Sequence, residues 1–130
     1  DETLDRWFGP KQRAVQPENI AAVRQWLDAV DPVGYARVYG CFAWADDAFT
    51  GRLPGLAVPA LFITGEYDPN STPAMSSRMA AESPRGELAI VLGERHMMGW
   101  VKPDSVNPLI ERFIRKAADE WAANREARLS

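Results

Sequence analysis

Two short apolar runs, each ended by a glycine, constrain the fold of this chain more than any other feature. Residues 58–64 (VPALFIT) are followed by Gly65, and residues 88–92 (LAIVL) are followed by Gly93. Runs of this length predict strands covered on both faces, as in a parallel sheet. The Thr-Pro pair at 72–73 predicts the start of a helix between them. The pattern is that of a strand–helix–strand unit with a right-handed crossover.

The rest of the chain is predicted to be helical. A long final helix follows the second run, and we expect its inner face to carry Leu109, Ile110, Phe113, Ile114, Ala117 and Trp121. Residues 1–53 contain several short helices, and one of them has an apolar stripe of Tyr35, Val38, Tyr39 and Phe42 at helical spacing. We expect the aromatic residues of this region, with Cys41, to lie in the core. Because the pattern changes near position 54, we divide the chain into residues 1–53 and 54–130.

The chemistry is predicted to lie where the two strands end. Parallel neighbours share an edge at their carboxyl ends, and ligands of open α/β sheets bind there. Asp68 follows the first run, and His96, the single histidine of the chain, follows the second. We therefore expect a carboxylate to lie beside an imidazole and to orient it as a general base. Glu66 is a weaker alternative for the acid, and a role for Asp68 in capping its turn is the alternative that the pairing with His96 disfavours.

Composition narrows the partners and the cellular setting. The formal net charge of −3 lacks the basic footprint of a nucleic-acid-binding protein. No apolar run approaches the roughly 20 residues that a membrane-spanning helix needs. Cys41 and His96 are single residues of their kinds, so we predict no metal site and no cofactor. A lone cysteine also favours a reducing, cytoplasmic setting.

Several segments resemble those of the α/β-hydrolases. Residues 62–68 (FITGEYD) and 93–97 (GERHM) are similar to the strand–acid and strand–histidine segments of that superfamily. Residues 4–8 and 32–36 look like the end of the helical cap of 3-oxoadipate enol-lactonases and their relatives. The resemblance implies the C-terminal portion of an α/β-hydrolase fold, with parallel strands, crossover helices and part of a cap in residues 1–53. It also implies that Asp68 is the triad acid and His96 the triad histidine.

The triad is incomplete within these residues. The α/β-hydrolase order is nucleophile, acid, histidine, with the nucleophile in a G-x-S-x-G turn, and that motif does not occur here. We expect a complementary N-terminal segment or chain to carry the nucleophile, and we expect the present chain to be inactive without it. The predicted activity is hydrolysis of a small ester, lactone or related acyl substrate. Alternatives are a non-catalytic binding module, a C–C bond hydrolase and a cofactor-free haloperoxidase-like enzyme; a homo-oligomer also remains open.

Four bulky residues are candidates for substrate contacts. Met97, Met98 and Trp100 crowd the loop after the second strand, and methionine adapts to varied apolar ligands. Trp44, in the helical region, is the fourth. Packing against the cap is the alternative role for the first three, and a place in the core is the alternative for Trp44.

Overall fold

The computed structural model describes residues 2–127, with the backbone alone at positions 46 and 47. In chain order the elements are α1 (Glu2–Trp7), α2 (Pro10–Val15), α3 (Pro17–Asp28), α4 (Pro32–Ala48), the 3₁₀ turn η1 (Leu53–Gly55), β1 (Ala60–Gly65), α5 (Pro73–Glu82), β2 (Gly86–Val91), α6 (Met98–Val101) and α7 (Pro103–Ala127). The helical character predicted for residues 1–53 is confirmed, as is the strand–helix–strand order that follows it.

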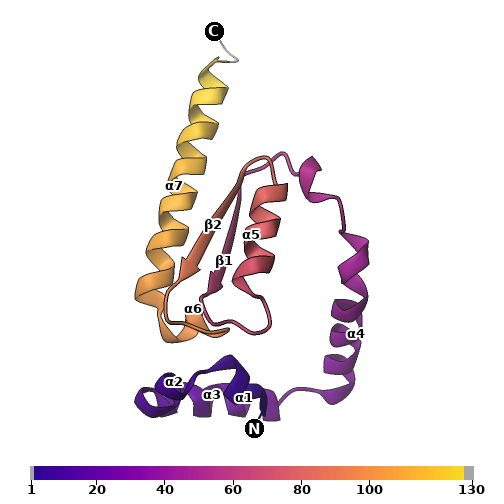
Figure 1. The fold of residues 1–130 in the computed structure, drawn as a ribbon, viewed down its shortest axis with the longest axis vertical. Helices are drawn as coiled ribbons and strands as arrows, with labels where there is room; N and C mark the ends of the chain where they lie inside the picture. Colours follow the sequence, from indigo (N-terminus) through magenta and orange to yellow (C-terminus); the bar gives the residue numbers. More distant parts are fainter. Residues whose placement is uncertain (1, 128–130) are drawn as a thin grey trace.

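The two strands form the predicted parallel pair. Their register runs from Ala60 opposite Gly86 to Gly65 opposite Val91. Helix α5 makes the crossover and covers one side of the pair, and α7 lies along the other (Figure 1). β1 begins two residues later than predicted. The reason is that Pro59 has no N–H to donate, so the ladder starts with the Ala60 amide, which donates to the Arg85 carbonyl (3.1 Å).

The cover over β2 is thinner than predicted. Leu88 and Ile90 are 40% and 38% exposed, so the expectation of burial on both faces is wrong for this strand within the described residues. The same narrowness limits α7. Leu109, Phe113 and Ala117, four residues apart, are half-buried, whereas Ile110, Ile114 and Trp121 are exposed. A pair of strands accommodates one row of helix side chains, and the second predicted row remains outside it.

Ion pairs on the surface also join α7 to β2. Lys116 donates to the Glu87 carboxylate (2.8 Å), and this hydrogen bond raises the pKa of the lysine above its ordinary value. Arg85, the residue just before β2, pairs with Glu120 one turn further along α7. Charged side chains therefore line much of this helix, and no helix among residues 2–127 is both long and apolar enough to cross a membrane.

The best-buried apolar cluster lies below the carboxyl ends of the strands. Its buried members are Leu4, Phe8, Ile20, Val23 and Val101, and Trp7, Leu27 and Met97 pack against it. Four of the five buried residues come from α1, the turn after it and α3, and Val101 comes from α6. The N-terminal helices α1–α3 are thus packed directly against the segment that follows β2 (Figure 1).

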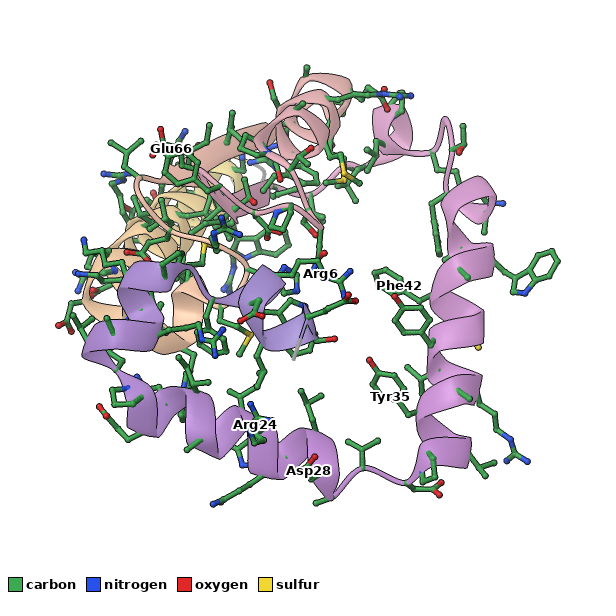
Figure 2. The ribbon with its side chains drawn as sticks, turned by 60° about the horizontal axis from the view of Figure 1, so that its bottom comes forward. Arg6, Arg24, Asp28, Tyr35, Phe42 and Glu66 are labelled. Carbon is green, nitrogen blue, oxygen red and sulfur yellow. The ribbon has the colours of Figure 1, made fainter. Side chains whose placement is uncertain are left out.

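Helix α4 stands apart from this cluster. It begins well, because Asp31 accepts a hydrogen bond from the Gly34 amide (2.7 Å) and Pro32 occupies the first turn. Its aromatic stripe is nevertheless exposed, with Tyr39 at 61% and Phe42 at 74%. Core placement of this stripe and of Cys41 is therefore wrong within the described residues, as it is for the exposed Trp26 of α3. The stripe points across an open space toward the rest of the chain, as the labelled Tyr35 and Phe42 show (Figure 2).

Candidate active site

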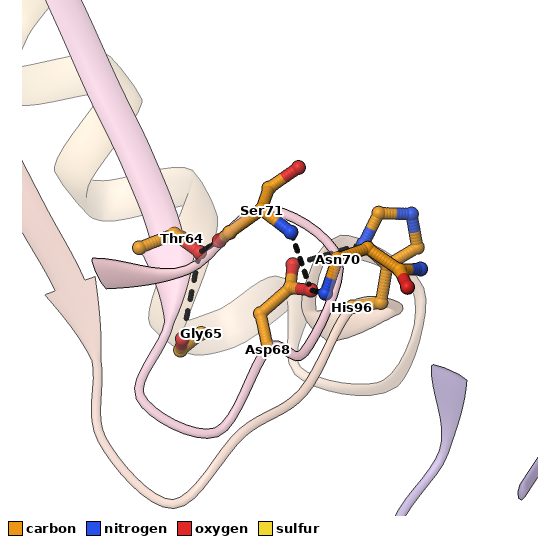
Figure 3. Close-up of polar contacts among 6 residues, drawn as sticks. All are labelled: Thr64, Gly65, Asp68, Asn70, Ser71 and His96. Atoms are coloured by element: carbon orange, nitrogen blue, oxygen red, sulfur yellow. Dashed lines mark hydrogen bonds and ion pairs between the residues drawn. The ribbon is translucent and has the colours of Figure 1, made fainter. Parts of the chain in front are cut away.

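The loop that leaves β1 (residues 66–71, the acid loop) holds the Asp68 carboxylate in a fixed orientation. The Asp68 amide donates to the Gly65 carbonyl (3.1 Å) and closes the turn. Oδ1 of Asp68 accepts hydrogen bonds from the amides of Asn70 (2.8 Å) and Ser71 (3.0 Å), as Figure 3 shows. The residue is 6% exposed. Because both backbone amides donate to Oδ1, the other carboxylate oxygen, Oδ2, is available to a partner outside the acid loop.

The loop that leaves β2 (residues 92–97, the histidine loop) is bonded to the acid loop in both directions. Gly93 has φ +75°, a left-handed conformation that glycine adopts without steric cost. Its amide donates to Oε2 of Glu66 (2.8 Å), and the Tyr67 amide donates to the Glu94 carbonyl (2.8 Å). The carboxylate of Glu66, the alternative acid, is therefore engaged at the Gly93 amide.

Gly65 lets the two loops approach each other closely. A Cβ atom at this position would lie 2.6 Å from the carbonyl oxygens of both Glu94 and Arg95, a distance that real Cβ atoms do not show. The neighbouring Thr64, 1% exposed, braces the acid loop by donating its hydroxyl to the Ser71 carbonyl (2.5 Å). The glycine that ends the first apolar run is thus also a packing requirement of the site.

Asp68 and His96 meet at this edge of the sheet, as predicted from the topology. Nδ1 of His96 lies 2.9 Å from Oδ2 of Asp68, although 28 positions separate the residues in sequence (Figure 3). The side chain of Asp68 is 5% exposed and that of His96 is 33% exposed. A carboxylate at Nδ1 favours the tautomer with the proton on that nitrogen. Nε2, on the far side of the ring, then carries the lone pair that can take a proton from a hydroxyl.

The N-terminal helices reach the imidazole as well. The indole of Trp7 lies 5.7 Å from the His96 ring, centroid to centroid, with an angle of 35° between the planes. The Met97 amide donates to the Trp7 carbonyl (3.4 Å). Trp7 was predicted to be a core residue, and it does pack on the apolar cluster, but its indole also borders the histidine.

Comparisons with known proteins bear on the fold of the chain. No family model matches the chain. Over 111 residues it is 33% identical to (E)-2-((N-methylformamido)methylene)succinate hydrolase of Acinetobacter baylyi, a match that covers 85% of the chain and 41% of that enzyme. A thermophilic esterase from Thermogutta terrifontis, solved with malate bound, superposes with a TM-score of 0.79 at 26% identity, over 89% of the chain and 42% of the esterase.

This chain forms the C-terminal portion of an α/β-hydrolase fold. The resemblance to the α/β-hydrolases and the predicted fold class are thereby confirmed, whereas the likeness of residues 1–53 to an enol-lactonase cap stays a prediction. The chain spans less than half the length of either protein that it matches.

The four residues predicted to contact substrate lie in different environments. Met97 packs on the apolar cluster, and Met98 is half-buried at the start of α6. Trp100 packs edge-on against Trp26 of α3, with 4.9 Å between ring centroids. The structure does not bring Trp44 to this loop, because it lies on α4 and is 85% exposed. Contact with substrate stays a prediction for all four.

Some residues of the site gave no sequence signal of their role. Gln12 and Glu94 form a buried hydrogen bond across the two halves of the chain, and nothing in their local sequence pairs them. The sequence predicted Thr64 only as the last residue of a strand, and nothing in it indicated the hydrogen bond to the acid loop. Among the described residues, no three histidine, cysteine or acidic side chains are grouped so as to hold a metal ion.

Proposed function

We propose that this chain supplies the acid and the histidine of a serine-type α/β-hydrolase that acts on a small ester, lactone or related acyl substrate. The single observation that carries the proposal is the 2.9 Å contact between Asp68 Oδ2 and His96 Nδ1 at the carboxyl ends of parallel strands. In this role Asp68 fixes the tautomer of His96 and stabilises the imidazolium when it forms.

The proposed reaction has two halves. A serine hydroxyl attacks the substrate carbonyl while His96 Nε2 accepts its proton, and His96 then returns the proton to the leaving group. Water next attacks the acyl-enzyme with His96 again as the base, and the carboxylic acid departs as the serine is regenerated. A histidine suits both directions of transfer because its ordinary pKa is about 6.5, close to neutral pH.

In this proposal the nucleophile belongs to a complementary N-terminal segment, whether a separate chain or part of the same one. The G-x-S-x-G turn that carries the serine in α/β-hydrolases is not present in these 130 residues. Support comes from the lengths of the relatives, because the chain matches only 41% of one and 42% of the other. The present chain alone is then expected to be inactive.

The names of the two relatives guide the choice of substrates. One is named for hydrolysis of a substituted succinate and the other is an esterase described with malate bound, so both are associated with small dicarboxylates. We therefore propose a test panel of short-chain p-nitrophenyl esters, simple lactones and monoesters of succinate. Turnover of any of these by the complete protein supports acyl hydrolysis.

The decisive variants are Asp68→Asn and His96→Ala in the complete protein. Asp68→Asn is expected to lower kcat by about 10⁴-fold, because the amide favours the wrong tautomer of the histidine. His96→Ala should abolish turnover. The matched control is Glu66→Gln, which keeps an oxygen for the Gly93 amide and should leave kcat within about threefold if transition-state contacts are unchanged. Asp68→Asn activity within tenfold of the unaltered protein would contradict the role of Asp68.

A further inference from the structure

A buried hydrogen bond ties the N-terminal helices to the histidine loop. Nε2 of Gln12, on α2, donates to Oε2 of Glu94 (2.6 Å) across 82 positions of sequence. Gln12 is 5% exposed and Glu94 is 3% exposed. A buried polar side chain costs free energy when it has no hydrogen-bond partner. The Gln12–Glu94 pair therefore favours the position of α2 against the histidine loop.

Glu94 also lies at the junction of the two site loops. Its carbonyl accepts the Tyr67 hydrogen bond from the acid loop, and its amide donates to the Val91 carbonyl (3.4 Å) at the end of β2. The carbonyl approaches Gly65 so closely that no Cβ fits between them. His96 follows two residues later. A shift of the Glu94 side chain is therefore transmitted to the segment that carries the imidazole.

The contact around this hydrogen bond is tight on the α2 side as well. Gly9, just before α2, is buried, and a Cβ there would lie 3.1 Å from Oε1 of Gln12 and 3.2 Å from Nε of Arg95. With the Trp7 carbonyl bonded to the Met97 amide, α1–α2 touch the histidine loop on both sides of His96. This part of the chain has little room to relax if one member is changed.

We propose that Gln12 and Glu94 are positioning residues, through which helices α1–α3 hold His96 at hydrogen-bonding distance from Asp68. The proposal rests on the proposed function of Asp68 and His96. It adds that the N-terminal helices position the general base, independently of any contact with substrate. Neither side chain is proposed to touch the reacting atoms.

The spectroscopic test is the downfield proton resonance of a histidine Nδ1–H that donates to a carboxylate. It is measured in the complete protein, and the signal of His96 is assigned by its loss in His96→Ala. We expect the signal to be lost or strongly broadened in Gln12→Ala and in Glu94→Ala, because the histidine loop is no longer held. In Glu94→Gln the signal should persist, because a glutamine oxygen at position 94 still accepts the hydrogen bond from Gln12.

Gln16→Ala is the matched control. Gln16 also joins the N-terminal helices to the C-terminal half, with its Nε2 donating to the Val101 carbonyl (3.2 Å), but it bonds to α6 and not to the histidine loop. This variant removes that hydrogen bond, together with the one that the Gln16 side-chain oxygen accepts from Asn19 (2.8 Å), and should keep the resonance. Loss of the signal in Gln16→Ala to the same extent as in Gln12→Ala would mean that any loosening of the helices suffices, and would overturn the specific role of the pair.

Kinetics on the same variants provide the second readout. Gln12→Ala and Glu94→Ala should lower kcat by about 10- to 100-fold with KM within about threefold, as expected when a catalytic group is displaced by about an ångström. Glu94→Gln should keep kcat within about threefold of the unaltered protein, because the role of the side chain is to position the loop and does not depend on its charge.

The outcomes separate the two proposals. A resonance and a kcat unchanged in Gln12→Ala and Glu94→Ala would overturn the positioning role while leaving Asp68 and His96 as the acid and base. Full activity of Asp68→Asn would overturn the proposed function itself. Should Glu94→Ala fail to fold, Gln12→Ala against Gln16→Ala still decides the question, because both remove one glutamine amide from the same group of helices.

Discussion

The two site loops and helix α4 both have regular local structure, but their side chains differ in how many contacts they make within this chain. The acid and histidine loops are bonded to each other by backbone amides, by Glu66 and by the Asp68–His96 contact. Helix α4 has a good N-cap, yet its aromatic stripe is exposed among the described residues. The loops need only the strands beneath them and the helices beside them, whereas the stripe is an apolar surface that needs a cover from elsewhere.

That difference indicates which parts of the site this chain organises by itself. The position of His96 relative to Asp68 follows from contacts within residues 2–127. The space between the stripe and the rest of the chain does not, and we propose that the complementary segment fills it. Substitutions in the two regions should therefore affect different properties of the protein.

The largest effect on stability is expected from Phe8→Ala. Phe8 is 1% exposed in the apolar cluster that supports the histidine loop, and removal of a buried phenylalanine ring costs about 3–5 kcal/mol. Urea denaturation of the complete protein measures the free energy of unfolding. A loss below about 1 kcal/mol would mean that the N-terminal helices are not held against the histidine loop by this cluster.

Gly65→Ala should come next. Its Cβ would meet two carbonyl oxygens at 2.6 Å, and overpacking of this kind costs about 1–3 kcal/mol. The two loops must separate to relieve the contact. The fall in kcat should therefore be larger in Gly65→Ala than in Phe8→Ala, although the loss in free energy of unfolding is smaller. Equal kcat in Gly65→Ala and the unaltered protein would show that the close approach of the loops does not matter to the site.

A smaller effect is expected at the start of α4. Asp31→Ala removes the side-chain oxygen that accepts from the Gly34 amide, and loss of an N-cap costs about 1 kcal/mol. Thermal unfolding of Asp31→Ala and of the unaltered protein measures this cost. Asp31→Asn is the control, because asparagine caps a helix about as well as aspartate. Activity should be unchanged in both variants, because the cap lies outside the two loops.

The smallest change in stability is expected from Tyr35→Ser with Phe42→Ser in the 130-residue chain by itself. Both side chains are exposed there, at 44% and 74%, so unfolding should shift by less than about 0.5 kcal/mol per residue. Self-association measured by sedimentation should decrease, since an exposed apolar stripe promotes it. In the complete protein the same pair should be strongly destabilising. An equally small effect in both settings would contradict a cover over the stripe.

The sequence allowed the fold and the central contact of the site to be predicted, for a topological reason. Two apolar runs separated by a helix imply parallel strands, and parallel strands bring Asp68 and His96 to one edge whatever the details of packing. The contacts between α2 and the histidine loop were not predictable in this way. Gln12 and Glu94 are paired by the docking of helices onto a loop, and single-sequence patterns carry no information on that docking.

The burial of the aromatic residues on α4 was predicted wrongly for a different reason. Helical spacing of Tyr35, Tyr39 and Phe42 shows that they share a face, but it does not show that this chain supplies the surface opposite. The same holds for Ile114 and Trp121 on α7. An apolar stripe predicts a partner surface, and its location has to come from the structure.

Asp68 and His96 are proposed to form an acid–base pair that acts on a nucleophile from outside these residues. A crystal structure of the complete protein after reaction with an alkyl phosphonate ester tests it most directly. We predict phosphorus bound to a serine Oγ of the complementary segment, with that oxygen about 2.6–3.2 Å from His96 Nε2 and Asp68 still bonded to Nδ1. A phosphonate bound elsewhere, or an imidazole turned away from Asp68, would contradict the claim.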